Sequence, residues 1–316
     1  MDRSRKNKLL AIVIVLLILL PFAKQLFVSE EEGIAFDQTL FTVADTASIS
    51  SVKIHGKSGL IELKKHDEAW IVNKKYQMEP SLRLVLFSVL KNLRAYKMLS
   101  GEELDQARDI LNNSGDTVSI RFQKKEKLIF ITGGRKEVPV SYFKKMGEEK
   151  IYAVRIPGYE SFVAGIFEIS ENDWRERVLY NSNWRTIKSI SVKYPGLDNA
   201  GFKIFDNGLR LVVQGVDNPD SSKIDEYIMH YNYFQVNEYI NRGKNAYYDS
   251  LSQTSPNISI SLDDIDKTWS SKANFYGIKP GNTKMVLGIR ENDGQWFLID
   301  QKRMVALAKR KSYFIK

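Results

Sequence analysis

The feature that most constrains this chain is an apolar run near its N-terminus. It extends over the 20 residues from Leu9 to Val28 and contains one charged residue, Lys24. As an α-helix this run would be about 30 Å long at ~1.5 Å per residue, which matches the hydrocarbon core of a bilayer. We therefore expect residues 1–28 to form a short tail and a single transmembrane helix.

Charge around this run predicts its orientation. Basic residues precede it and Ser-Glu-Glu-Glu follows it directly. Because basic flanks stay in the cytoplasm, we expect a cytoplasmic N-terminus and a periplasmic bulk at a bacterial inner membrane. A cleaved signal peptide is the alternative, but Pro21-Phe22-Ala23, the nearest cleavage candidate, has Pro where a small residue belongs. The topology-determining residues are Arg3, Arg5, Lys6 and Lys8.

Composition excludes several protein classes. The chain is 43% hydrophobic and 27% charged, which is enough apolar material for folded cores. Nearly half of the net charge of +9 lies in residues 1–28, so the rest is too weakly basic to indicate a nucleic-acid-binding protein. The chain has no Cys, which excludes disulfides, thiolate metal sites and a Cys nucleophile.

Beyond a polar linker at 29–47, strand and helix patterns occur in two similar series. Alternating apolar and polar residues predict strands at 48–54 and 60–65, and again at 186–194, 201–205 and 209–214. A helix follows in each half, after Pro80 in the first and near a Ser222-x-x-Asp225 start in the second. Further strands close each half, and a last helix is expected near 301–310.

These patterns predict an α+β fold. After the transmembrane helix, we expect two similar units of antiparallel sheet packed on a helix, related by an internal repeat about 140 residues apart. Chance similarity of two α+β halves is the alternative. The predicted domains are 1–28 for the tail and anchor, 29–47 for the linker, 48–166 for the first unit, 167–185 for a bridge and 186–316 for the second unit.

No motif for catalysis, cofactor or metal binding is found. The three histidines, His55, His66 and His230, have no paired metal-ligand spacing. Gly56-Lys57-Ser58 ends like a phosphate-binding loop, but it lies between two predicted strands and indicates a hairpin turn. Asp263, Asp264 and Asp266 lack a calcium-loop continuation and are best explained as a solvated turn. We therefore predict no catalytic residue, cofactor or metal.

A resemblance to a known family adds to this picture. The runs WIVNKKYQMEPSLRLVLFSVLKNLRAY (70–96) and WRERVLYNSNWRTIKSISVKYP (174–195) are similar to the bacterial membrane-anchored domain-of-unknown-function family 4340. That family is associated with gliding-motility-type ABC transporter components and is frequent in Bacteroidota. The resemblance spans about residues 35–300. It implies an extracytoplasmic accessory role and provides no catalytic residues to assign.

The sequence therefore favours a non-catalytic, membrane-anchored accessory or scaffold protein. Its expected partners are membrane lipid, through the anchor, and a protein component of an envelope transport or secretion complex. Two alternatives remain: a membrane-tethered hydrolase of envelope polymers, and a lipid- or glycan-binding module. The oligomeric state is not predicted.

Overall fold

The fold is known from a computed structural model that describes residues 36–123, 127–278 and 285–316. The predicted anchor at 9–28 and the basic residues Arg3, Arg5, Lys6 and Lys8 lie outside these ranges. Within them, no helix is both long and apolar enough to cross a membrane.

The chain divides into two compact units, and the first is the smaller. It holds the described part of Met1–Thr46, with Val89–Asp116 and Leu128–Gly165. Helix α3 (Gly101–Ser114) packs Ala107 and Leu111 against Tyr142 and Ile151 of the sheet. This unit contains α3 with β5 (Arg94–Met98), β8 (Val140–Lys145), β9 (Ile151–Arg155) and most of β7 (Lys127–Arg135).

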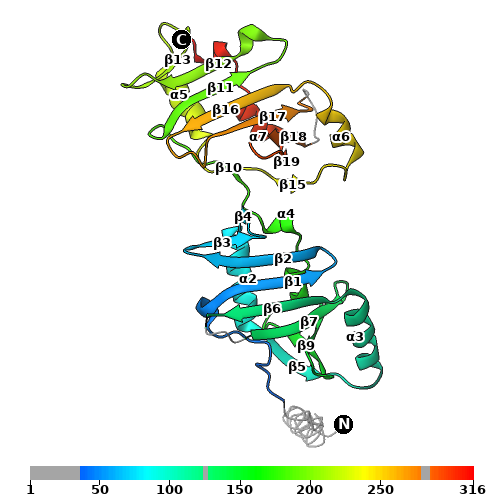
Figure 1. Cartoon of the computed structure of the whole chain (residues 1–316). Helices are drawn as coiled ribbons and strands as arrows, with labels where there is room; N and C mark the ends of the chain where they lie inside the picture. The colour runs from blue at the N-terminus through cyan, green and yellow to red at the C-terminus, as the bar shows by residue number, and fades with distance from the viewer. Residues whose placement is uncertain (1–35, 124–126, 279–284) are drawn as a thin grey trace, which may run out of the picture. The chain divides into compact units, whose positions relative to one another are not determined.

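The second unit holds the rest of the chain, including all of Ile166–Lys316. Its early elements are β1 (Ile49–Gly56), β2 (Gly59–His66), β3 (Ala69–Val72), β4 (Tyr76–Gln77), most of α2 (Pro80–Asn92) and β6 (Asp116–Phe122). The antiparallel sheet formed by β1 to β9 has the order β4-β3-β2-β1-β6-β7-β8-β9-β5 (Figure 1).

An eight-stranded antiparallel sheet forms most of the remaining second unit. Its order is β13-β12-β11-β16-β17-β18-β19-β15 (Figure 1). The strands are β11 (Ile187–Lys193), β12 (Phe202–Asp206), β13 (Leu211–Val213), β15 (Glu238–Ile240), β16 (Ile258–Asp264), β17 (Ser271–Tyr276), β18 (Val286–Arg290) and β19 (Gln295–Ile299).

Helices cover both faces of this sheet. Helices α5 (Ser221–Met229) and α7 (Gln301–Leu307) pack with Ile190, Val286 and Phe297 in the main core. Residues that alternate with these along the strands, such as Leu287 and Leu298, face α6 (Ala246–Ser252). The period-2 alternation of a strand therefore supplies two cores, one on each face.

The remaining elements are short. Strand β10 (Val178–Tyr180) pairs with β14 (Phe234–Gln235) in a third, two-stranded sheet. Helix α4 (Glu171–Trp174) has one turn, and its N-cap Ser170 accepts a hydrogen bond from the Asp173 amide. The 3-10 helices are η1 (Thr46–Ser48), η2 (Val163–Phe167), η3 (Asp198–Ala200) and η4 (Lys311–Phe314).

The predicted α+β class is wrong. The described residues form mostly antiparallel β-sheet, arranged in three sheets, with few helices. Helices do occur in both series, but most consecutive strands of each series are joined by turns rather than by helices, so strands predominate. The expected helix after Pro80 does begin there, whereas α5 begins after the N-cap Asp220 instead of the predicted Ser222.

The two larger sheets share a strand order. The series β2-β1-β6-β7-β8-β9-β5 in one corresponds to β12-β11-β16-β17-β18-β19-β15 in the other. Each central pair also has a register shift at the same place, between Ile49 and Ser51 in β1 and between Ile187 and Ser189 in β11. Bulges of this kind are specific features of a strand pair. The internal repeat stays a hypothesis, and this correspondence supports it.

A half-buried tyrosine predicts how stability depends on pH. Tyr194 donates a hydrogen bond to the Lys309 carbonyl (2.5 Å), and burial raises the pKa of its hydroxyl to about 12. Because the folded-state pKa lies above the value in the unfolded chain, stability from this group is present below about pH 10 and is lost as pH rises toward 12. Tyr194→Phe should reduce the alkaline loss of unfolding free energy, measured by urea titration at pH 8 and pH 11. An unchanged loss would contradict this assignment.

Candidate functional site

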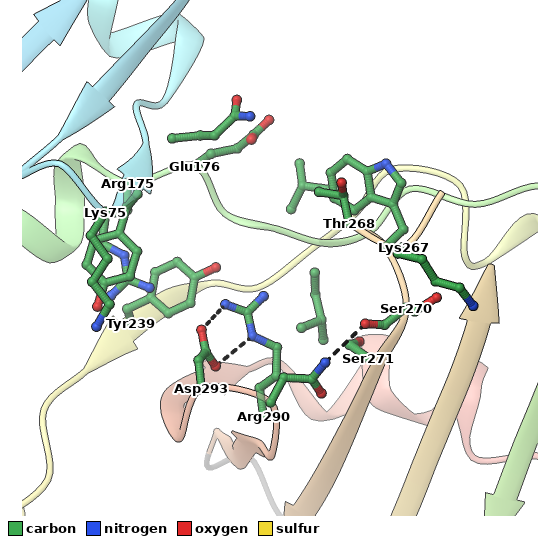
Figure 2. A pocket seen from close by; sticks show the side chains of 16 residues that line it. Lys75, Arg175, Glu176, Tyr239, Lys267, Thr268, Ser270, Ser271, Arg290 and Asp293 are labelled. Atoms are coloured by element: carbon green, nitrogen blue, oxygen red, sulfur yellow. Dashed lines mark hydrogen bonds and ion pairs between the residues drawn. The ribbon is translucent and has the colours of Figure 1, made fainter. Parts of the chain in front are cut away.

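The second unit contains a polar hollow of about 360 Å³ that we call the Arg175 pocket. Its walls come from separate segments of the sequence: β4, the residues after α4, β15, the loop before β17, and the β18–β19 hairpin (Figure 2). The lining residues used below are Tyr76, Arg175, Glu176, Tyr239, Arg290 and Asp293.

The backbone around Arg175 is held by hydrogen bonds on both sides. The Glu79 amide donates to the Trp174 carbonyl (2.8 Å), and the Glu176 amide donates to the Gln77 carbonyl (2.8 Å). Helix α4 ends at Arg175, whose backbone is extended. The position of the Arg175 Cα atom, from which the side chain extends, is therefore fixed by the backbone.

The Arg175 guanidinium lies between two aromatic rings. Its Cζ atom is 3.5 Å from the Tyr76 ring centroid and 3.8 Å from that of Tyr239, and the residue is only 3% exposed. Its Nη1 atom donates to Asn172 Oδ1 (3.2 Å). Burial lowers the pKa of Arg175. Gln295 fixes one of the rings by donating to the Tyr76 hydroxyl (2.9 Å).

The other arginine of the pocket is neutralised. Arg290 binds Asp293 through two hydrogen bonds, Nε to Oδ1 (2.9 Å) and Nη2 to Oδ2 (2.6 Å), and Figure 2 shows this pair. Burial alone would raise the pKa of Asp293, but the hydrogen bonds and charge of Arg290 outweigh it, so the pKa is lowered. Asp293 is thus an ionised partner of Arg290 and a poor proton acceptor.

Glu176 is the other carboxylate of the pocket. Burial, with a smaller contribution from the charge of Glu79, raises its pKa. Its neutral form is therefore favoured more than that of a solvent-exposed glutamate. Because Arg290 is paired with Asp293, Arg175 is the arginine whose charge bears on a ligand, and the chemistry this arrangement supports most directly is binding of a negatively charged group.

A second hollow, of about 470 Å³, lies beside β13, and we call it the Trp184 groove. Its members include Trp184, Arg185, Leu209, Leu211, Ile224 and Asp225. Trp184 is 63% exposed and Leu209 is 93% exposed, whereas Ile224 at the groove is buried. Arg185 lies 4.9 Å from the Trp184 ring centroid. The groove therefore brings two large exposed apolar side chains together next to charged groups.

Comparison of the chain with protein-family models, with curated proteins and with solved structures finds no match. The resemblance to the family of unknown function therefore stays a prediction, and both hollows are interpreted from their own chemistry.

The residues that the sequence offered as candidates for chemistry lie outside the Arg175 pocket, whereas the two runs that carry the family resemblance contribute Tyr76 and Arg175 to it. None of the three histidines lines it, and in the described ranges no group of three His, Asp or Glu side chains could hold a metal. The hairpin turn predicted at Gly56-Lys57-Ser58 is confirmed, since Gly56 pairs with Gly59. The solvated turn predicted for the three aspartates is wrong for Asp264, which is buried and accepts hydrogen bonds from Thr186 Oγ1 (2.8 Å) and the Asp266 amide (2.9 Å).

Sequence reasoning missed Arg175 and Leu209. For Arg175 the sequence offers one weak signal. The residue follows Trp174 in a segment that has no amphipathic pattern, so neither a helix nor a strand pattern accounts for its position. For Leu209 the signal was Asp206-Asn207-Gly208, a typical turn sequence that should have placed the leucine in a turn rather than in a strand.

Proposed function

We propose that this chain is a non-catalytic accessory protein that binds a protein component of an envelope transport or secretion complex. We further propose that residues 9–28 anchor it in the bacterial inner membrane, with the bulk of the chain in the periplasm. The observation that carries the binding role is the Trp184 groove, where the exposed side chains of Trp184 and Leu209 line the same hollow.

Two ordered turns hold these side chains outward. Asn207 Oδ1 accepts hydrogen bonds from the amides of Leu209 and Arg210 (both 3.0 Å), which places Leu209 at the tip of the β12–β13 turn. Asn183 Oδ1 accepts from the Arg185 amide (2.9 Å), which fixes the turn that carries Trp184. Because both turns are already ordered, a partner would lose little of its binding free energy to ordering them.

The chemistry of the groove fits a protein partner. Binding energy at protein interfaces is concentrated in a few anchors, among which Trp and Arg are enriched. Covering apolar area stabilises a complex by about 25 cal/mol per Å², so an exposed Trp and an exposed Leu in one hollow favour association. The acidic side chains Asp206 and Asp225 add polar groups that can fix the orientation of the bound segment.

The test uses the full chain, tagged and expressed in its native host. Crosslinking and gentle solubilisation should recover a stoichiometric partner, identified by mass spectrometry. The double variant Trp184→Ala/Leu209→Ser should recover at least about tenfold less partner, which corresponds to about 1.4 kcal/mol of binding free energy. Leu60→Ser is the matched control, since Leu60 is also exposed but is not part of the groove.

Two results would oppose the proposal. If the double variant recovers as much partner as the wild-type protein, the groove is not the contact surface. If the folded protein is recovered from membranes as a monomer without any partner, the accessory role is contradicted.

A further inference from the structure

We propose that the Arg175 pocket binds a small anionic molecule through a carboxylate or phosphate group placed against the Arg175 guanidinium. This proposal does not depend on the Trp184 groove, which has other residues and a different kind of partner. It rests on the burial of Arg175, on the geometry of the two rings, and on the lack of an ion-pair partner for Arg175 among the residues that the structure describes.

Within the described residues, Arg175 is a buried cation without an ion-pair partner. The hydrogen bond of its side chain there goes to Asn172, a neutral amide. Its Nε atom is buried and has no hydrogen-bond partner there. A buried charge is strongly unfavourable unless it is paired, so the pocket has an unmet requirement for negative charge.

The nearby carboxylates are bonded to other groups. Asp293 is held by both hydrogen bonds of Arg290. Glu171, which also interacts electrostatically with Arg175, accepts a hydrogen bond from Asn73 Nδ2. Neither forms an ion pair with Arg175, so both act on its charge only from a distance.

The two tyrosine rings restrict how a ligand can approach. Tyr76 and Tyr239 cover the two faces of the guanidinium, so only its edge is available. Its N–H groups point outward in the plane of the guanidinium, and this planar fork matches the oxygens of a carboxylate or a phosphate. Stacking on both faces also holds the fork in one orientation before the ligand arrives.

The rest of the lining favours an anion of modest size. Two of its four cations have carboxylate partners, since Arg290 is paired with Asp293 and Lys267 with Asp263, and the other two are Lys75 and Arg175. Lys75 lies over the Tyr76 ring, with Nζ 4.8 Å from the centroid, and Figure 2 shows it beside Arg175. A volume of about 360 Å³ suits a molecule of the size of a single sugar acid.

The test measures binding to the full chain in nanodiscs made from neutral lipid. Isothermal titration at constant ionic strength uses sodium glucuronate, inorganic phosphate and glucose. We expect saturable binding of at least one of the two anions and none of glucose. The anion that binds distinguishes a sugar acid from a phosphate group as the source of the charge.

Variants assign the binding to Arg175. Arg175→Met should weaken binding at least tenfold, and Arg175→Lys should do so too, because it keeps the charge but loses the planar fork. Arg303→Met is the matched control, since Arg303 also lies over an aromatic ring, that of Phe234 (5.2 Å), but is not part of the pocket. It should leave the affinity unchanged.

The wild-type protein alone is sufficient to reject the proposal, even if the Arg175 variants fail to fold. Absence of saturable binding for both glucuronate and phosphate would overturn it and leave Arg175 as a purely structural clamp between the two rings. Binding that persists in a folded Arg175→Met variant would overturn it as well.

Discussion

Replacement of Trp174 by Ala is expected to lower the free energy of unfolding by about 3–5 kcal/mol, the usual range for truncating a fully buried Trp. The Trp174 side chain is fully buried, with 0% exposed. The Trp174 carbonyl also accepts a hydrogen bond from the Glu79 amide, which fixes the backbone at this position. Loss of the indole leaves a cavity that the fixed backbone cannot close. Urea denaturation followed by circular dichroism measures the change.

Trp184→Ala is the matched control for this prediction. It removes the same side chain from a position that is 63% exposed, so the free energy of unfolding should change by about 0.5 kcal/mol or less. The two variants thus separate packing from binding, because Trp184→Ala should also weaken partner recovery. Equal destabilisation by both substitutions would show that packing of the Trp174 side chain does not stabilise the fold as expected.

Gly288→Ala is expected to destabilise the eight-stranded sheet by about 1–3 kcal/mol, as overpacking of a core does. Gly288 lies in β18, opposite Phe275 on one side and Phe297 on the other. A methyl group at position 288 would fall far inside the van der Waals distance of the Phe297 ring. That ring is fully buried and packs edge-on against Phe275, so it has little room to move.

A compensating substitution tests the cause of this effect. Phe297→Leu shortens the side chain that meets the new methyl group, so the double variant should be less destabilised than the sum of the two single variants. Gly165→Ala is the control, because its new methyl group would meet only the partly buried Phe162 at 3.1 Å. Strict additivity in the double variant would contradict the proposed clash.

The sequence predicted individual elements better than it predicted the fold class. Alternating residues correctly indicated strands in the regions of β1 and β11, and Pro80 correctly indicated the start of α2. Local patterns of this kind depend on which residues of a segment are buried. The class depends on how many strands join each sheet, which is set by pairing between distant segments and leaves no local pattern.

The strand predicted at 209–214 illustrates a local failure. Its apolar residues alternate as a strand requires, but β13 begins only at Leu211. The Asn207 side chain bonds the amides of Leu209 and Arg210, and these bonds draw both residues into the turn. Competition between an Asn side chain and the sheet is the physical reason for the difference.

The Arg175 pocket could not have been predicted at all. Its main members, Tyr76, Arg175, Tyr239 and Arg290, come from four segments that no motif connects. Each has an ordinary explanation on its own, as a strand residue or a surface charge. Only their arrangement around one buried guanidinium distinguishes them.

The strand order has a consequence for how the chain folds during its synthesis. In both larger sheets a central pair joins segments far apart in sequence, with Val52 opposite Ile120 and Ile190 opposite Leu262. Such pairing is slow to form, because the loop between the strands must close first. During synthesis from the N-terminus, β1 is made well before β6, and β11 well before β16, so one hydrogen-bonding edge of each early strand stays open to other chains. The rate of synthesis and the availability of chaperones should therefore control the yield of this protein more than its final stability does.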